Sequence, residues 1–474
     1  MNAYQKLFKN SIIYAIANIG SKLLTFLLVP FYTYVLSTSE YGTIDMIMTT
    51  TALFLPIITL SIYDATLRFT VNTKIENERS YIFSSSLILV ILGNIIFLLF
   101  YPIMNKIGMF QEYLYLFYIV IFLQGIYSVI SQFIRAIGNV KTFAISGIIS
   151  TFIMLVLNIL LLAKFRMGIR GYLYSIIISN IITIFFMITS SKVWIYFKVS
   201  YWDREIVKKM LIFSIPLIPN TLMWWIMNVS DRYVIAMFMG ESSIGIYAIA
   251  NKIPSILNLL NTIFFQAWQI SAIEEDNSEY KSQFYTNIFS IYSSIMLISA
   301  SFILVFIKPV VTNLLSTSFS EVWRYVPFLL LASVFSSFST FLGANYIAMK
   351  KTKNVFITSV YGGLINILLN FVLIKQFGLN GTTFATMMSF FVVWILRVVD
   401  TKNFTGLKIN IKKVASTIII VLLQILIVIN DYKYSISVQS ILFILILTLN
   451  MKELKYMLVK VLKKLKNIYY FRKA

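Results

Sequence analysis

The sequence predicts an all-α, polytopic membrane protein with about 14 transmembrane helices. The chain of 474 residues is 59% hydrophobic and only 12% charged, whereas soluble domains are about one quarter charged. Apolar stretches of roughly 20 residues, the length that crosses a bilayer, recur from Ser11 to Asn450 with short polar joints between them. We therefore expect a bundle of membrane-spanning helices with no separate soluble domain.

The individual spans follow from counting apolar segments between charged joints. The first segment runs on from the N-terminus without a small-residue cleavage site, so we expect it to be retained as a helix. The last is short for a span, and a re-entrant end with thirteen spans stays open as the alternative. The fourteen segments are 11–36, 43–66, 81–101, 112–134, 142–163, 171–190, 209–238, 244–270, 283–307, 323–348, 355–374, 381–399, 413–430 and 435–450.

The distribution of lysine and arginine predicts the orientation, because positively charged loops stay cytoplasmic. With the N-terminus inside, the inner side carries 29 of the 40 cations and the outer side 9. One predicted outer joint does not fit this distribution, since it holds three cations, Lys164, Arg166 and Arg170. We expect a multi-pass membrane protein with both termini cytoplasmic. The net charge of +22 is then an orientation signal and not evidence for nucleic-acid binding.

Two stretches of the chain repeat at a nearly fixed distance. The motif AIGNVKTF from Ala136 matches AMKKTKNV from Ala348, and Gly168 matches Gly378, 210 residues later. A second match joins Tyr41-Gly42-Thr43-Ile44 to Ile244-Gly245-Ile246-Tyr247 at a distance of 203 residues. Fixed spacing of this kind indicates two related halves.

The repeats predict how the chain is divided. Each half holds six helices, an even number, so both halves start on the same side and a pseudo-twofold axis lies along the membrane normal. We predict an N-terminal lobe over 1–200, a C-terminal lobe over 201–405 and two extra transmembrane helices over 406–450. The basic tail over 451–474 has apolar residues at helical spacing, which predicts an amphipathic helix on the cytoplasmic leaflet.

Two lysines inside predicted spans are candidates for a substrate cavity. A charge near the middle of the bilayer costs at least about 2.5–3.5 kcal/mol and is normally turned toward a wet cavity or a partner. Lys22 lies about 18 Å along its helix beyond Asn10, by the rise of 1.5 Å per residue, and Lys252 lies at similar depth in segment eight. An alternative is that each lysine pairs with a buried acid. The predicted cavity residues are Lys22, Asn18, Lys252, Asn251, Ser255 and Asn258.

Four further charged residues are candidates for gating or ion coupling. Asp64 and Arg68 stand at i,i+4 and can form an ion pair on one helical face. The alternative is that the two residues form a cytoplasmic gate. Asp231 and Arg232 lie near the end of segment seven, whose two prolines, Pro216 and Pro219, predict a kinked or locally unwound helix. Asp45 is expected to be a solvated or cavity-lining cap.

Absent residue types exclude several kinds of chemistry. The chain has no cysteine and no histidine, so disulfides, thiolate metal sites and cysteine or histidine nucleophiles are ruled out. A P-loop motif is missing as well. We expect a transporter without cofactor or metal, driven by a gradient or by its substrate, and not an enzyme.

Three stretches of the chain carry a resemblance to a known family: the opening NSIIYAIANIGSKLLTFLLVPFYTYVLSTSEYGTIDM, the stretch IYDATLRF and the segment SDRYVIAMFMGESSIGIYAIANKI. They resemble bacterial flippases for O-antigen and capsule repeat units, of the multidrug/oligosaccharidyl-lipid/polysaccharide exporter superfamily, which are proteins of the bacterial plasma membrane. The resemblance implies a two-lobed fold that moves an undecaprenyl-pyrophosphate-linked oligosaccharide across the membrane by alternating access. It also implies a cationic central cavity around Lys22 and Lys252, although this chain has few cations there.

The resemblance leaves other functions open. A cation-coupled multidrug exporter of the same superfamily would have a similar overall sequence pattern and is the second hypothesis. A membrane polymerase or glycosyltransferase of polysaccharide assembly is the third. Coupling to H+ or Na+ would use carboxylates such as Asp64 or Asp231, because histidine is absent. A polysaccharide polymerase and glycosyltransferases are the expected protein partners.

Overall fold

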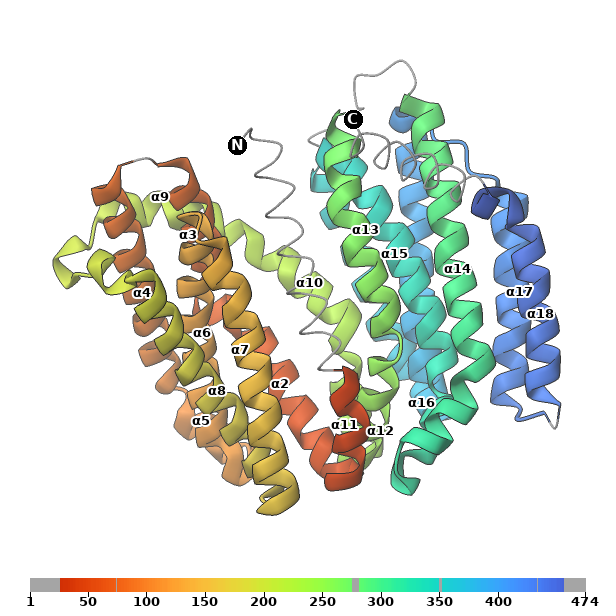
Figure 1. Cartoon of the computed structure of the whole chain (residues 1–474), viewed down its shortest axis with the longest axis horizontal. Coiled ribbons are helices and arrows are strands. Elements are labelled where there is room, and N and C mark those ends of the chain that lie inside the picture. Colours follow the sequence, from red (N-terminus) through yellow and green to blue (C-terminus); the bar gives the residue numbers. More distant parts are fainter. Residues whose placement is uncertain (1–25, 74, 275–280, 349–351, 433, 456–474) are drawn as a thin grey trace, which may run out of the picture. The chain divides into compact units, whose positions relative to one another are not determined.

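The computed structural model of the chain describes residues 26–73, 75–274, 281–348, 352–432 and 434–455 (Figure 1). Over these residues every regular element is a helix, which confirms the predicted all-α class. The chain divides into two compact units, residues 1–248 and 249–474. The predicted lobe boundaries at 200/201 and 405/406 stay predictions.

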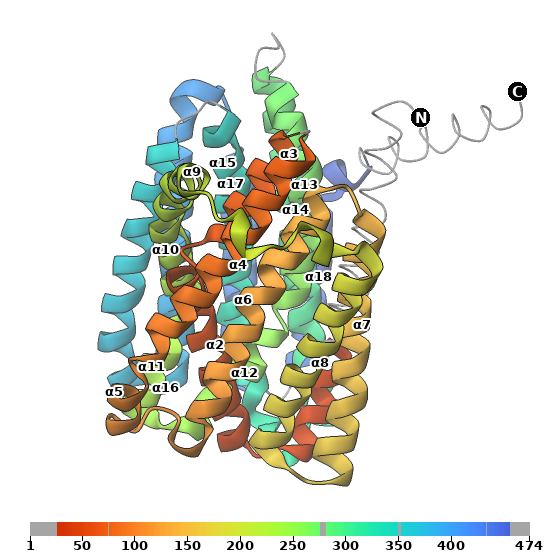
Figure 2. The ribbon, with the colours of Figure 1, turned by 90° about the vertical axis from the view of Figure 1, so that its left-hand side faces the viewer.

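The described part of the first unit begins with the helix Phe26–Val35 and continues through α2 to most of α12. Its elements are α2 (Thr38–Ile58), α3 (Ile62–Asn72), α4 (Glu76–Leu98), α5 (Tyr101–Lys106), η1 (Gln111–Tyr113), α6 (Leu114–Ala136), α7 (Val140–Asn158), η2 (Ile159–Lys164), α8 (Gly168–Ser191), η3 (Val193–Tyr196), η4 (Val199–Tyr201), α9 (Arg204–Ser214), η5 (Ile215–Leu217), α10 (Ile218–Val229), α11 (Asp231–Met239) and α12 (Glu241–Lys252). Figure 2 shows α6, α7 and α8 running side by side.

The second unit holds the remaining helices. They are α13 (Ser255–Glu274), α14 (Lys281–Leu314), η6 (Thr317–Arg324), α15 (Val326–Ala348), α16 (Thr352–Thr405), α17 (Ile411–Ile429) and α18 (Ser435–Leu449). Gly378 interrupts α16 with φ 56° and ψ −136°, so α16 consists of two helices.

The described residues contain 10 helices that are long and apolar enough to cross a membrane, and up to 11 if α12 and α13 form one bent span. Two shorter apolar helices are Phe26–Val35 and Ser435–Leu449. Each of the fourteen predicted segments therefore overlaps a described helix, with α16 accounting for two, although residues 11–25 of the first segment lie outside the described residues. The multi-pass architecture is confirmed, and fourteen is an approximate count because two segments match shorter helices and a third is the bent pair α12 and α13.

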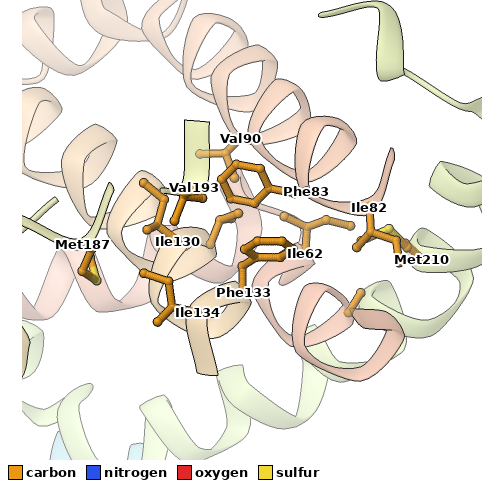
Figure 3. Packing of buried hydrophobic residues seen from close by; sticks show 12 residues of the cluster. Ile62, Ile82, Phe83, Val90, Ile130, Phe133, Ile134, Met187, Val193 and Met210 are labelled. Carbon is orange, nitrogen blue, oxygen red and sulfur yellow. The ribbon is translucent and has the colours of Figure 1, made fainter. Parts of the chain in front are cut away.

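A cluster of buried side chains from α3, α4, α6 and neighbouring elements forms a core in the first unit (Figure 3). The rings of Phe83 and Phe133 pack with their centroids 4.4 Å apart. Small residues of α4, Ser84, Ser85 and Ser86, are fully buried. Close approach at small side chains is what holds membrane helices together, because lipid gives no hydrophobic drive between them.

The repeat is visible in the backbone. Gly168, at the start of α8, and Gly378, inside α16, both have positive φ, 53° and 56°. Only glycine adopts such a conformation without strain. The repeat also aligns Asn158 with Asn370, 212 residues later, and both asparagines are fully buried. Equivalent positions of the two halves thus have equivalent structure.

The predicted kink at Pro216 and Pro219 is confirmed. The α-helix α9 ends at Ser214, the short 3₁₀-helix η5 covers the first proline, and α10 begins at Ile218, directly before the second. Proline has no N–H and clashes with the preceding turn, so the α-helical ladder cannot continue through this segment.

Two extra helices, α17 and α18, are fixed to α14 at three heights. Lys413 of α17 forms an ion pair with Glu453 just past α18, and Gln424 and Gln439 exchange side-chain to backbone hydrogen bonds in the middle. The Ser301 hydroxyl of α14 donates to Gln424 at 2.7 Å. At the opposite end Lys308 of α14 pairs with Asp431. These hydrogen bonds between buried amide and hydroxyl groups fix the packing of the three helices.

Candidate functional site

Two of the predicted cavity residues, Lys22 and Asn18, lie outside the described residues. The other four, from the start of the second unit, gather at a helix break: Lys252, Asn251, Ser255 and Asn258. The axis bends by 40° between α12 and α13, where Pro254 cannot donate a backbone hydrogen bond. Ser255 and Asn258 are exposed and the other two half-buried.

The Ser255 hydroxyl donates to the carbonyl of Lys252 and caps the broken end. Broken helices place free backbone carbonyls at membrane depth, where transporters coordinate substrates and ions. The four predicted residues thus lie at one helix break, and their place in a substrate cavity stays a prediction.

A buried charge cluster joins α2, α11 and α12 within the first unit. Arg232 donates through Nε to Asp45 at 3.2 Å and through NH1 to Asp231 at 2.8 Å. The hydroxyl of Tyr247 donates to the other oxygen of Asp231, and its ring lies 5.1 Å from the Arg232 guanidinium carbon. Asp231 is 1% exposed and Arg232 7%. The predicted pair Asp231 and Arg232 is therefore part of a larger network.

The break between α10 and α11 positions this cluster. Asp231 stands in the first turn of α11, where a carboxylate is favoured by the helix dipole. Arg232 donates a further hydrogen bond, 2.8 Å long, to the carbonyl of Asn228 in α10. One guanidinium thereby binds both sides of the break and the neighbouring helix α2.

Two contacts with α2 flank the cluster. Trp225 of α10 donates from Nε1 to the carbonyl of Thr49 at 2.9 Å. The hydroxyls of Tyr233 in α11 and Thr50 in α2 lie 2.5 Å apart. Because both helices of the broken segment bond to α2, its position depends on α2.

The first of the two alternatives predicted for Asp45, a solvated cap, is wrong. Asp45 is not a solvated cap, since only 13% of its side chain is exposed and the carboxylate pairs with Arg232. The partner is 187 residues away in sequence, so no local pattern links the two.

The helices α2 and α12 cross in backbone contact at two glycines. A Cβ on Gly42 would lie 2.0 Å from the carbonyl oxygen of Glu241, and a Cβ on Gly245 would lie 1.9 Å from that of Thr38. The contacts are reciprocal, because Thr38 and Gly42 stand 203 residues before Glu241 and Gly245. The two copies of the second sequence match therefore pack against each other.

Hydroxyl groups and one carboxylate surround this crossing. Thr38 and Ser242 share a hydrogen bond of 2.6 Å. Oε2 of Glu241 accepts from Ser39 at 3.1 Å and from Thr43 at 3.0 Å. We call these five residues, with Gly42 and Gly245, the α2–α12 crossing.

Asp64 and Arg68 lie on α3, which follows a sharp turn with positive φ at Leu60 and Ser61. Within the described part of the chain they form no ion pair with each other. The guanidinium carbon of Arg68 instead lies 4.7 Å from the ring centre of Phe213 in α9. This cation–π contact ties α3 to α9, and a role in gating stays a prediction.

A buried arginine in the second unit escaped the sequence reasoning. Arg397 of α16 is 1% exposed, and no acidic side chain pairs with it among the described residues. It donates to the Ser339 carbonyl at 2.7 Å, to the hydroxyls of Thr358 and Ser359 at 3.1 Å each, and to the Val355 carbonyl at 3.4 Å. The sequence signal for this residue is a single arginine within the apolar run SFFVVWILRVVD. The count of loop charges assigned this arginine to a cytoplasmic joint and not to the span.

The repeated helices, the broken spans and the buried charges define a polytopic membrane protein of the transporter class. The chain belongs to the polysaccharide biosynthesis protein family, because the family's sequence profile matches residues 7–270, more than half of the chain. No curated protein sequence matches this chain.

The fold is similar to that of solved transporters and flippases. The lipid II flippase MurJ in an inward closed conformation superposes with a TM-score of 0.71 at 16% identity, covering 94% of this chain and 100% of that chain. A multidrug resistance MATE family transporter of the MOP superfamily, in an inward-facing conformation, gives a TM-score of 0.62 at 15% identity over 81% of this chain and 99% of its own. An outward-facing structure of such a transporter superposes with a TM-score of 0.59 at 17% identity, covering 85% of this chain and 95% of that chain. At these identities the likeness establishes the fold.

Proposed function

We propose that this protein is a flippase that moves undecaprenyl-pyrophosphate-linked oligosaccharide units across the bacterial plasma membrane for a surface polysaccharide such as O-antigen or capsule. The observation that carries the proposal is membership of the polysaccharide biosynthesis protein family over residues 7–270. The fold shared with a lipid II flippase supports a lipid-linked cargo.

The transport cycle we propose is alternating access with both termini in the cytoplasm. Lys22, Asn18 and the residues at the α12–α13 break, Lys252, Asn251, Ser255 and Asn258, line the cavity that receives the pyrophosphate. A cationic cavity suits this group, because two phosphates carry the charge of the cargo.

Four charged residues act in gating or in coupling to H+ or Na+: Asp64, Arg68, Asp231 and Arg232. The network around Arg232 supports this assignment, because one guanidinium links α2, α10 and α11. A rearrangement of any of these helices must break one of its hydrogen bonds. The protein acts as a carrier and not as an enzyme, beside glycosyltransferases and a polymerase that supply and consume the cargo.

The proposal is tested in a deletion strain complemented with variants. The strain should accumulate lipid-linked repeat units that are inaccessible to reagents added outside the cell. Lys22→Ala should restore little surface polysaccharide at normal protein level, and Lys22→Arg should restore more, because it keeps the charge.

Other outcomes would contradict the proposal. Short units that are exposed on the outer side would indicate a polymerase. Normal surface polysaccharide together with increased drug sensitivity would indicate a multidrug exporter, the activity named for the MATE structures of similar fold. Full restoration by Lys22→Ala would reject the cavity role of that residue alone.

A further inference from the structure

A cavity of about 400 Å³ lies within the first unit, beside the α2–α12 crossing. Its volume falls within the range of about 300–1,000 Å³ that is usual for small-molecule sites. The wall comes from α2, the joint 108–113, α8, α11 and α12. The orientation prediction places this joint on the outer side of the membrane.

The lining combines hydrogen-bond acceptors with flat apolar surfaces. The two carboxylates are Glu40 and Glu241, and no lysine or arginine is among the described lining residues. Hydroxyls come from Ser39, Thr43, Thr50, Tyr113 and Tyr233, and the rings of Phe110, Tyr113 and Tyr233 also line the space. A phosphate would find no positive partner here.

Both carboxylates are held in place by hydroxyl donors. Oε2 of Glu241 accepts from Ser39 and Thr43, and Oε2 of Glu40 accepts from the backbone and hydroxyl of Ser37. The second oxygen of each carboxylate, Oε1, accepts no hydrogen bond from the described residues. Ionised carboxylates have about four acceptor positions, so each retains capacity for a ligand.

We propose that this cavity is a subsite for the sugar part of the cargo, where Glu40 and Glu241 accept hydrogen bonds from sugar hydroxyls and the aromatic rings cover pyranose faces. This inference rests on the proposed function and divides the cargo by chemistry. The pyrophosphate goes to the lysine-lined cavity, and the uncharged hydroxyl-rich end goes to the acceptor-lined cavity on the predicted outer side. Hydrogen bonds to an ionised carboxylate are the strong ones, and rings supply apolar area with a defined orientation.

The position of Glu241 links the subsite to the crossing. A sugar hydroxyl that bonds to Oε1 of Glu241 uses the same carboxylate whose Oε2 accepts from Ser39 and Thr43 of α2. The residue that contacts the sugar is therefore also one that joins α2 to α12.

The test measures binding of a lipid-free oligosaccharide to the full chain in nanodiscs by calorimetry. The probe is released by mild acid from the lipid-linked units of the deletion strain. Glu40→Gln and Glu241→Gln should each weaken binding by roughly 10-fold or more, the loss of a hydrogen bond to a charged group. Tyr113→Leu removes a ring without touching the hydrogen bonds of the crossing, and it should also weaken binding.

The control is Glu321→Gln, a carboxylate that does not line the cavity and pairs with Arg324 at an exposed site. The affinity of this variant for the oligosaccharide should stay within about twofold of the wild-type value, because an exposed ion pair contributes little. Unchanged affinity in all three cavity variants would overturn the subsite, even if the strain accumulates lipid-linked units and the flippase function holds. Competition by tetraphenylphosphonium that depends on Glu40 and Glu241 would assign the cavity to organic cations instead. A strain without accumulated units would reject the flippase function first, and this inference with it.

Discussion

Arg232 Nε lies 3.2 Å from Asp45 Oδ2, and the side chains are only 8% and 13% exposed. The pair joins the start of α11 to α2 across 187 residues of sequence. Burial of two charges is costly unless their geometry and hydrogen bonds are good. Here the same guanidinium also binds Asp231 and the Asn228 carbonyl, so three of its N–H contacts are directed at acceptors.

Replacement of Arg232 by alanine should destabilise the protein strongly. The change leaves Asp45 and Asp231 without their described cation, and breaking a buried pair typically costs about 3–5 kcal/mol. The thermal midpoint in detergent measures the effect. Arg170→Ala is the control, because its pair with Glu112 is about half exposed and such pairs contribute about 0–1 kcal/mol. Equal shifts for the two variants would contradict the assignment of the Arg232 network as buried.

Replacement of Gly42 by alanine should force α2 and α12 apart. The new Cβ would lie 2.0 Å from a backbone oxygen, a distance that only helix movement can relieve. We expect a lower thermal midpoint for Gly42→Ala and for Gly245→Ala. Gly147→Ala is the matched control, because nothing lies within 4 Å of its Cβ position, and alanine there favours the helix by about 0.5–1 kcal/mol. A Gly42 variant as stable as the Gly147 variant would refute the close crossing.

Sequence reasoning recovered the features that depend on local pattern. The spans follow from apolar runs, the break after Ser214 follows from Pro216, and Gly168 and Gly378 were found because their spacing repeats. The pairing of Asp45 with Arg232 was missed, since it depends on how two distant helices rotate and pack. Arg397 was counted as a boundary cation because hydropathy does not reveal which side of a helix faces protein. Lys22 remains a prediction from helix depth alone.

Substitution of Arg397 by lysine should destabilise the second unit more than substitution by methionine. Lysine keeps a buried charge but presents one compact ammonium in place of a planar fork, and the lost hydrogen bonds are worth about 1–3 kcal/mol. Methionine removes the charge. The hydroxyls of Thr358 and Ser359 then still donate hydrogen bonds to backbone carbonyls of their own helix. The aligned residue of the first half is the buried Met187. Thermal midpoints of both variants give the comparison, and a lysine variant as stable as wild type would contradict it.

Stability should depend on pH through Glu453, which lies beyond the last span. Burial opposes ionisation of Glu453, but hydrogen bonds and charge from Lys413 and a hydrogen bond from Ser290 hold its pKa below the ordinary value of about 4.5. A depressed pKa stabilises the folded state above the unfolded pKa and ceases to do so as the pH falls through the folded value.

The difference in thermal midpoint between wild type and Glu453→Gln should thus be present near neutral pH and shrink below about pH 4.5. Glu321→Gln is the control, since its pair with Arg324 is largely exposed and contributes about 0–1 kcal/mol. A difference between wild type and Glu453→Gln that persists unchanged into acid would show that the ionised carboxylate does not hold α18.

A disulfide across the α2–α12 crossing should stop transport. Thr38 and Ser242 have hydroxyl oxygens 2.6 Å apart, which places their Cβ atoms within the reach of a disulfide. The chain has no cysteine of its own, so the double variant Thr38→Cys/Ser242→Cys has no background reaction. Oxidation should form the bond, and surface polysaccharide should fall and recover with reductant, because alternating access requires these helices to separate. Thr49→Cys/Ser242→Cys is the control, with Thr49 about 16 Å further along α2 by helical rise. Full transport with the Thr38–Ser242 bond formed would show that the crossing stays closed throughout the cycle.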